Sequence, residues 1–179
     1  MRRHLFALAI AFLAATGFAS LPATAQPWRD PEQHFFQPFL GDLPAELQLA
    51  QKAGKKGVLV IYEMEGCPFC VRLHRTALRE PAVQDYYRRH FSVFRVDLLG
   101  ATTITGFDGR DATESAFASQ QKVRGTPTSV FYDLGGRELA RFTGAPRDRQ
   151  EYLLLGEFVV DGHYRTTSFP GFRRARTGQ

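Results

Sequence analysis

The sequence predicts a single α/β domain in which helices flank a central mixed sheet. Segments with helical spacing of apolar residues alternate with short apolar runs, a pattern that favours layered structure with parallel strands. Near the end, the strand-like residues 128–132 and 138–142 enclose the turn sequence DLGG and predict an antiparallel hairpin at one edge of the sheet. The length of 179 residues suits one ordinary domain.

Composition narrows the class of protein further. The chain is 44% hydrophobic and 23% charged, as expected for a folded globular protein rather than a disordered one. Its two cysteines are too few for a four-cysteine zinc site, an iron–sulfur cluster held by one chain, or a multi-disulfide scaffold.

Residues 1–25 have the pattern of a cleaved secretory signal peptide. Arg2 and Arg3 give a basic start, an apolar run follows, and the sequence ATA at 23–25 offers a small-x-small cleavage site before Gln26. The apolar run is shorter than the roughly 20 residues needed to span a bilayer, which disfavours the alternative of a retained anchor. We expect an exported chain of formal charge +3, reduced from +5 by loss of the two arginines, with no stable membrane insertion and no nucleic-acid partner.

The first elements follow from local signals. Residues 26–41, rich in proline and aromatics, predict an irregular lead-in that packs its rings on the domain. The domain itself is expected over residues 42–163. Its first helix opens at Asp42, which can cap it, and Pro44 suits the first turn. The apolar run at residues 58–62 predicts a central strand buried on both faces.

The next elements alternate as an α/β fold requires. Residues 67–79 predict a helix, Pro81 interrupts it, and a short second helical piece is expected to reach Arg88. Residues 91–96 predict a strand. The glycine- and threonine-rich residues 100–111 predict a surface insertion.

Two helices and a tail complete the prediction. The helices are expected over residues 112–122 and 146–160. Residues 164–179 form a basic C-terminal tail with three closely spaced arginines, for which we predict a frayed, solvated segment rather than a binding patch.

The sequence GCPFC at residues 66–70 carries the chemistry. It follows a buried strand and opens a helix, whose unpaired N–H groups and dipole favour a thiolate at Cys67. Pro68 lies in the first turn, where a missing N–H costs nothing. Cys70 is one turn further on, close enough to form a short disulfide. We expect Cys67, at the exposed helix tip, to attack a substrate disulfide and Cys70, deeper, to resolve the mixed disulfide.

Two alternatives stay open beside a redox dithiol. One is an inert disulfide, although so short a loop adds little stability. The other is a metal site, because His74 shares a helix face with both cysteines; no fourth ligand is indicated, so we expect no metal. Covalent haem attachment is disfavoured because Val71, not histidine, follows the second cysteine.

Thr126 and Pro127 form a second signal just before a predicted strand. Proline cannot donate a hydrogen bond within a sheet, so it suits a strand start. A cis Thr126–Pro127 bond would expose the backbone of Thr126 at a sheet edge, where an extended substrate could pair beside Cys67. We therefore predict that both residues bind substrate.

Together, the strand at 58–62, the GCPFC motif, VRGTPT at 123–128 and GGRE at 135–138 resemble the thioredoxin superfamily. The resemblance covers residues 43–161 and implies a sheet flanked by helices and a cis Pro127 facing the two sulfurs. Within the superfamily the chain is similar to exported SoxW-type thioredoxins associated with sulfur-oxidation clusters. This likeness depends on EGCPFC with its following LH, the insertion, and RFTGA at 141–145.

Departures from the thioredoxin pattern also inform the prediction. Pro68 and Phe69 between the cysteines are closer to the glutaredoxin pattern, and we expect them to tune the dithiol. The aspartate that accepts a proton in thioredoxins falls at Ile61, and its lysine neighbour falls near Arg95. Replacement acceptors are Glu63, Glu65 or a water molecule.

The resemblance implies a periplasmic thiol–disulfide oxidoreductase that needs no cofactor and reduces protein disulfides or protein-bound thiol adducts. Because the periplasm is oxidising, a membrane thiol transporter would supply electrons, a partner implied by the family. Three alternatives stay open: a dithiol oxidase or isomerase that forms disulfides, a non-catalytic thioredoxin-fold binding module, and glutathione-dependent chemistry.

Overall fold

A four-stranded mixed sheet forms the centre of the computed structural model, which describes residues 28–178. The signal segment predicted at residues 1–25 lies outside the described residues. The strand order is β2-β1-β5-β6, with β1 parallel to β2 and antiparallel to β5, and β5 antiparallel to β6. The bounds are β1 (Gly57–Glu63), β2 (Phe91–Asp97), β5 (Thr128–Asp133) and β6 (Glu138–Thr143). The predicted mixed α/β sheet with a hairpin at one edge is confirmed.

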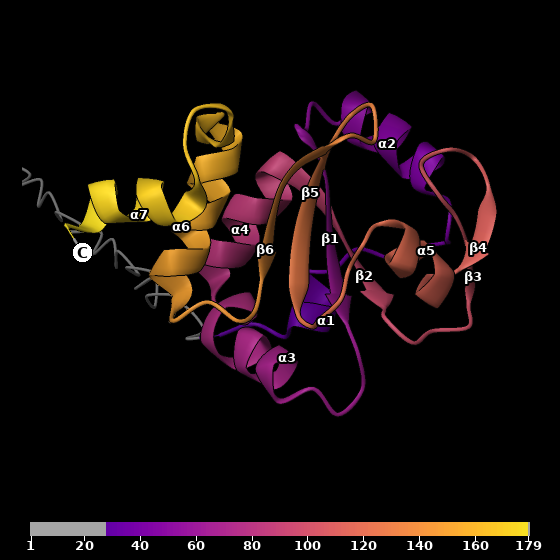
Figure 1. Cartoon of the computed structure of the whole chain (residues 1–179), viewed down its shortest axis with the longest axis horizontal. Coiled ribbons are helices and arrows are strands. Elements are labelled where there is room, and N and C mark those ends of the chain that lie inside the picture. Colours follow the sequence, from indigo (N-terminus) through magenta and orange to yellow (C-terminus); the bar gives the residue numbers. More distant parts are fainter. Residues whose placement is uncertain (1–27, 179) are drawn as a thin grey trace, which may run out of the picture.

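Helices cover both faces of this sheet (Figure 1). Alternate residues of β1 face opposite layers: Leu59 and Ile61 pack with one set of helices, and Val60 and Tyr62 with the other. The first layer comprises α3 (Pro68–Leu73), α4 (Pro81–His90), α6 (Arg149–Val160) and α7 (Phe169–Thr177). The second comprises α2 (Leu43–Lys52) and α5 (Glu114–Gln120). All of β1 is therefore buried, as its continuous apolar run predicts.

Helix boundaries follow the capping signals closely. The Asp42 side chain accepts a hydrogen bond from the Ala45 amide at 2.9 Å and caps α2 as expected. The predicted helix at 67–79 is α3 continued by a π-helical turn, His74–Leu78. The predicted short piece after Pro81 is the full ten-residue helix α4. Within the described residues, none of the helices has the length and apolar character needed to cross a bilayer.

The lead-in is more ordered than its composition predicts. It contains the single-turn helix α1 (Pro31–His34), and Phe35 and Phe36 are buried as expected. Trp28 is 55% exposed, so the prediction that it packs on the domain is wrong. The Gln37 amide donates to the carbonyl of Val93 at 2.9 Å, which fastens the lead-in along the outer edge of β2.

The insertion at residues 100–111 carries a small hairpin that the sequence did not predict. Strands β3 (Thr103–Thr105) and β4 (Asp111–Thr113) pair antiparallel, and the buried Ile104 anchors them to the domain. The Thr105 amide donates to the carbonyl of Gly41 at 2.6 Å. The insertion is thereby joined to the lead-in, and α5 begins after β4, two residues later than predicted.

The prediction of a frayed C-terminal tail is wrong. After a short 3-10 turn, His163–Arg165, the chain forms α7, whose Phe169 and Phe172 are buried against Phe158 at ring-centroid distances of 5.6 and 5.5 Å. Arg173 also pairs with the buried carboxylate of Glu151 on α6. Apolar burial and one buried ion pair therefore hold this basic segment on the domain.

We predict that Phe172→Ala destabilises the mature chain by about 3 kcal/mol, because it removes a buried aromatic ring. Urea unfolding followed by circular dichroism measures the change. The control is Arg174→Ala on the exposed side of the same helix, for which we expect a change within about 0.5 kcal/mol. Equal unfolding midpoints for the two variants would show that α7 does not stabilise the domain.

Candidate functional site

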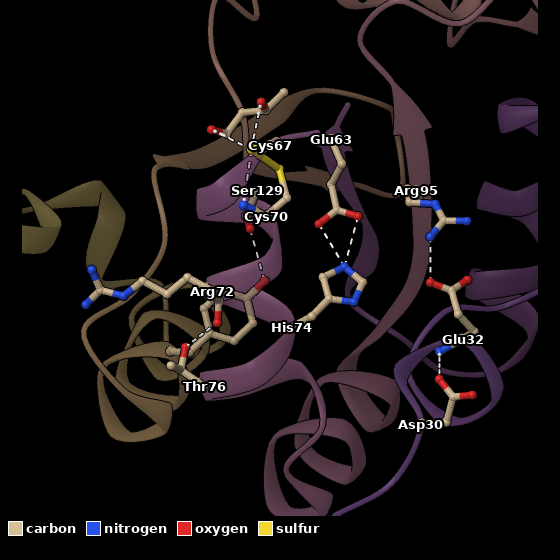
Figure 2. Close-up of polar contacts among 12 residues, drawn as sticks. Asp30, Glu32, Glu63, Cys67, Cys70, Arg72, His74, Thr76, Arg95 and Ser129 are labelled. Carbon is tan, nitrogen blue, oxygen red and sulfur yellow. Dashed lines mark hydrogen bonds and ion pairs between the residues drawn. A yellow bond between two sulfur atoms is a disulfide. The ribbon is translucent and has the colours of Figure 1, made fainter. Parts of the chain in front are cut away.

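The two cysteines lie at the start of α3, after the short loop that follows β1 (Figure 2). Cys67 is the N-cap residue of α3, and its sulfur accepts a hydrogen bond from the Cys70 amide at 3.1 Å. The two residues form a disulfide with their Cα atoms 5.3 Å apart. Pro68 occupies the first helical position as predicted. Gly66 has φ +71°, a left-handed conformation that glycine adopts without strain and that turns the chain into the helix.

The expected contrast in exposure between the two cysteines is wrong for this oxidised state. Cys67 is 5% exposed and Cys70 is 6% exposed. Cys67 is buried because Thr126 lies against its sulfur and covers the N-terminal end of the helix. The two cysteines differ in their hydrogen bonding. Cys67 is the N-cap residue and its sulfur accepts hydrogen bonds, whereas Cys70 lies within the first turn of the helix.

The predicted Thr126–Pro127 segment lies against the disulfide and contacts the Cys67 sulfur. This peptide bond is cis, Pro127 is buried, and the Thr126 hydroxyl donates to the Cys67 sulfur at 3.2 Å. The Thr126 carbonyl oxygen lies 3.5 Å from the same sulfur. In the reduced protein, a Cys67 thiolate in this position would receive two donors, the Cys70 amide and the Thr126 hydroxyl. Charge-assisted hydrogen bonds of this kind stabilise the thiolate, which is the nucleophile.

Apolar side chains stand exposed around the disulfide. Phe69, between the cysteines, is 58% exposed, Val71 is 48% exposed, and Met64 is 38% exposed. The predicted tuning role of Phe69 is untested. Its exposure makes the ring available to a docking substrate.

A buried carboxylate is hydrogen-bonded to a histidine that follows the active-site cysteines. The side chain of Glu63, at the end of β1, is 9% exposed, and its two oxygens lie 2.9 and 3.0 Å from His74 Nε2. When a carboxylate is ionised it can only accept, and the ring nitrogen is then the donor. Figure 2 shows Glu63 between the disulfide and His74, which follows Cys70 by one turn of the active-site helix. Glu65, the other proposed proton acceptor, is exposed.

The other two positions compared with thioredoxins take no part in the site. Ile61 is fully buried in the apolar core. Arg95 pairs with Glu32 at 2.5 Å and stacks over the Phe36 ring at 5.4 Å. Its guanidinium group therefore interacts with residues of the lead-in.

Sequence reasoning missed a pair of buried hydroxyls between β5 and α6. The Ser129 hydroxyl, on β5, lies 3.0 Å from the Tyr152 hydroxyl of α6. Burial raises the pKa of Tyr152, while the Ser129 hydrogen bond lowers it and the charge of Glu63 raises it. The phenol therefore stays protonated and cannot serve as a base at neutral pH. A serine among apolar strand residues was the only signal in the sequence.

We predict that Thr126→Val lowers the fraction of Cys67 thiolate, because valine has the shape of threonine without its donor. Loss of one hydrogen bond to a charged group corresponds to roughly a tenfold change. The rate of iodoacetamide alkylation of the reduced protein at neutral pH measures it. Thr126→Ser retains the hydroxyl and should stay close to wild type. Equal rates for the valine and serine variants would show that the hydroxyl does not act on the thiolate.

The fold and the dithiol define the class: a thioredoxin-fold chain with a Cys-x-x-Cys pair at a helix N-terminus beside a cis-proline loop. A family model described as a thioredoxin-like domain matches residues 43–159, and the chain belongs to that family. No curated protein sequence matches it.

Solved structures agree on the fold. A thioredoxin-fold protein from Helicobacter pylori is 20% identical, with a TM-score of 0.62 over 83% of this chain and 94% of the other. A putative disulphide-isomerase from Bacteroides thetaiotaomicron is 23% identical, with a TM-score of 0.57 over 76% and 98%. A thioredoxin from Thermus thermophilus is 28% identical, with a TM-score of 0.53 over 70% and 86%.

Proposed function

We propose that this protein is a periplasmic thiol–disulfide oxidoreductase that reduces protein disulfides or protein-bound thiol adducts. The observation that carries the proposal is the hydrogen bonding of the Cys67 sulfur. It accepts one hydrogen bond from the Cys70 amide and one from the Thr126 hydroxyl. An inert disulfide has no need of donors that stabilise a thiolate. The exposed Phe69 and the cis-proline loop provide surface for a substrate chain around that sulfur.

The reaction proceeds in two exchanges. The Cys67 thiolate attacks one sulfur of the substrate disulfide, that bond breaks, and the other substrate sulfur leaves as a thiolate. The Cys70 thiolate then attacks the Cys67 sulfur, the mixed disulfide breaks, and the Cys67–Cys70 disulfide forms. Two electrons pass from the dithiol to the substrate, whose two released thiolates take up protons.

Deprotonation of Cys70 in the second exchange is assigned to Glu63 in this proposal. Figure 2 draws its buried carboxylate between the disulfide and His74, whereas Glu65 is exposed and Ile61 carries no acidic group. The hydrogen bond from His74 orients the carboxylate toward the active-site helix. In this proposal Glu63 is the proton acceptor for the resolving cysteine.

Location and electron supply are further parts of the proposal. The basic start, apolar run and small-residue site of residues 1–25 support export. Because the periplasm keeps thiols oxidised, a reductase there needs electrons, for which we propose a membrane thiol transporter. The EGCPFC motif supports a SoxW-type specificity.

The reduction potential of the Cys67–Cys70 couple tests the proposal. The mature chain is equilibrated with dithiothreitol or glutathione buffers, and free thiols are trapped. We expect a value near that of thioredoxin, about −270 mV. A value near that of strong oxidants, about −120 mV, would instead favour the oxidase function, and absence of a reversible couple would contradict any redox function.

A further inference from the structure

A cavity of about 600 Å³ lies directly beside the loop that leads to Cys67. One wall is formed by the ends of β1 and β2, including Glu63, Met64 and Glu65. The opposite wall comes from two segments outside the central sheet, residues 39–41 of the lead-in and residues 102–104 of the insertion. We call this cavity the β2 cleft. The hydrogen bond from the Thr105 amide to the Gly41 carbonyl joins the two outer segments to each other.

Charge in the β2 cleft is predominantly negative. Glu65 and Asp97 are exposed at its wall, and Glu114, which accepts a hydrogen bond from the Asp97 amide, also lines it. The guanidinium of Arg95 does not offset them, because it is bound to Glu32 and stacked on Phe36. Since the mature chain carries a net positive charge, this local concentration of carboxylates opposes the charge of the molecule as a whole.

The floor of the cleft includes an open stretch of sheet edge. Along the outer edge of β2, Val93 is bonded to Gln37, and the Asp97 amide is bonded to the Glu114 carboxylate at 3.1 Å. Arg95 lies between them on the same edge, because alternate residues of a strand direct their amides to the same side. Within residues 28–178, its amide and carbonyl have no hydrogen-bond partner on that side. The backbone of Arg95 can therefore hydrogen-bond one residue of an extended chain that lies in the cleft.

Apolar side chains border the same cleft. Leu40 is 94% exposed and Met64 is 38% exposed, and both line the cavity. An exposed leucine beside an open strand edge and three carboxylates suits a peptide that is partly apolar and positively charged. A small anion or an acidic chain would be repelled by the same carboxylates.

We propose that the β2 cleft binds the extended segment of a substrate protein that flanks its reactive cysteine, and that it prefers segments with lysine or arginine. The inference rests on the proposed function, since it concerns which substrates reach Cys67. A basic side chain of the substrate lies among Glu65, Asp97 and Glu114, while its backbone runs along the open edge at Arg95. The lead-in and the insertion thus determine specificity.

The test uses two seven-residue peptides with a central cysteine activated by thionitrobenzoate. One peptide has lysines beside the cysteine and the other has glutamates. Reduced mature Cys70→Ser protein attacks the peptide sulfur through Cys67, forms a mixed disulfide and releases coloured thionitrobenzoate. The ratio of the two second-order rate constants is measured at low and high salt. Neutral hydroxyethyl disulfide, assayed on the wild-type protein, reports thiol chemistry without a peptide segment.

At low salt we expect the lysine peptide to react roughly fivefold faster, although the net charge of the protein favours the glutamate peptide. High salt should reduce the ratio towards one. The double variant Glu65→Gln/Asp97→Asn should also abolish the preference. The matched control, Glu157→Gln/Asp161→Asn, removes two carboxylates from α6 and its C-cap and should retain the preference.

Two outcomes would overturn the inference: no preference for the lysine peptide in the wild-type background, or a preference that survives in the Glu65→Gln/Asp97→Asn variant. Failure of the proposed function gives a different result. If the chain lacks thiol–disulfide exchange altogether, neither the peptides nor hydroxyethyl disulfide would react faster than with a free thiol, and both proposals would be lost together.

Discussion

A Cys70→Ser variant is expected to accumulate a covalent mixed disulfide with a protein substrate, whereas a Cys67→Ser variant should form none. The structure gives the reason. The Cys67 sulfur accepts hydrogen bonds from the Cys70 amide and the Thr126 hydroxyl, and these bonds stabilise its thiolate for attack. Cys70 is the group that releases the substrate, and serine cannot form the closing disulfide. Both variants should lose steady-state turnover almost completely.

Insulin reduction measures turnover, and non-reducing gel electrophoresis after acid quenching detects the mixed disulfide. The double variant Cys67→Ser/Cys70→Ser is the control for non-covalent binding. If Cys70→Ser formed no adduct while Cys67→Ser did, the roles of the two cysteines would be reversed. If Cys67→Ser retained every function of the protein, the chain would be a non-catalytic binding module with a structural disulfide.

Much of the fold was predictable because its signals are local. The apolar run of β1, the cap at Asp42 and the turn between β5 and β6 each depend on neighbouring residues alone. The misplaced elements depend on distant contacts. Helix α7 forms because Phe169 and Phe172 find a surface on α6, and the three arginines of the same segment suggest a solvated tail when read alone.

The candidate site divides in the same way. Spacing predicted that Cys67 and Cys70 could bond, and the resemblance to the thioredoxin superfamily implied that a cis Pro127 would lie near them. Spacing could not show that the Thr126 hydroxyl reaches the Cys67 sulfur, or that both cysteines are almost equally buried. These facts depend on how the loop before β5 lies over the helix tip.

The Glu63–His74 contact was the least predictable part of the site. The two residues are eleven positions apart, one at a strand end and one at the start of a π-helical turn. That turn follows α3 directly, and π-helical turns in proteins often occur at functional sites. Helical spacing placed His74 on the face of the two cysteines, but it could not show that the Glu63 side chain at the end of β1 meets that face.

We expect Glu63→Gln to slow release of substrate from the mixed disulfide by about a hundredfold at neutral pH, a typical contribution of a positioned base. Glutamine has nearly the same shape and can still hydrogen-bond His74, but it cannot accept a proton from Cys70. Single-turnover release of a fluorescent thiol held on Cys67, measured across a range of pH, isolates this step. The rate of the variant should rise steadily with pH, since hydroxide then replaces the missing base.

Two comparisons separate proton transfer from mere support of the fold. Glu65→Gln removes the exposed carboxylate nearest in sequence and should slow release far less. The urea midpoint of Glu63→Gln reports any structural damage, and that damage would not change the shape of the pH profile. An unchanged release rate and profile in Glu63→Gln would leave water as the proton acceptor, because the Tyr152 phenol stays protonated in its buried position.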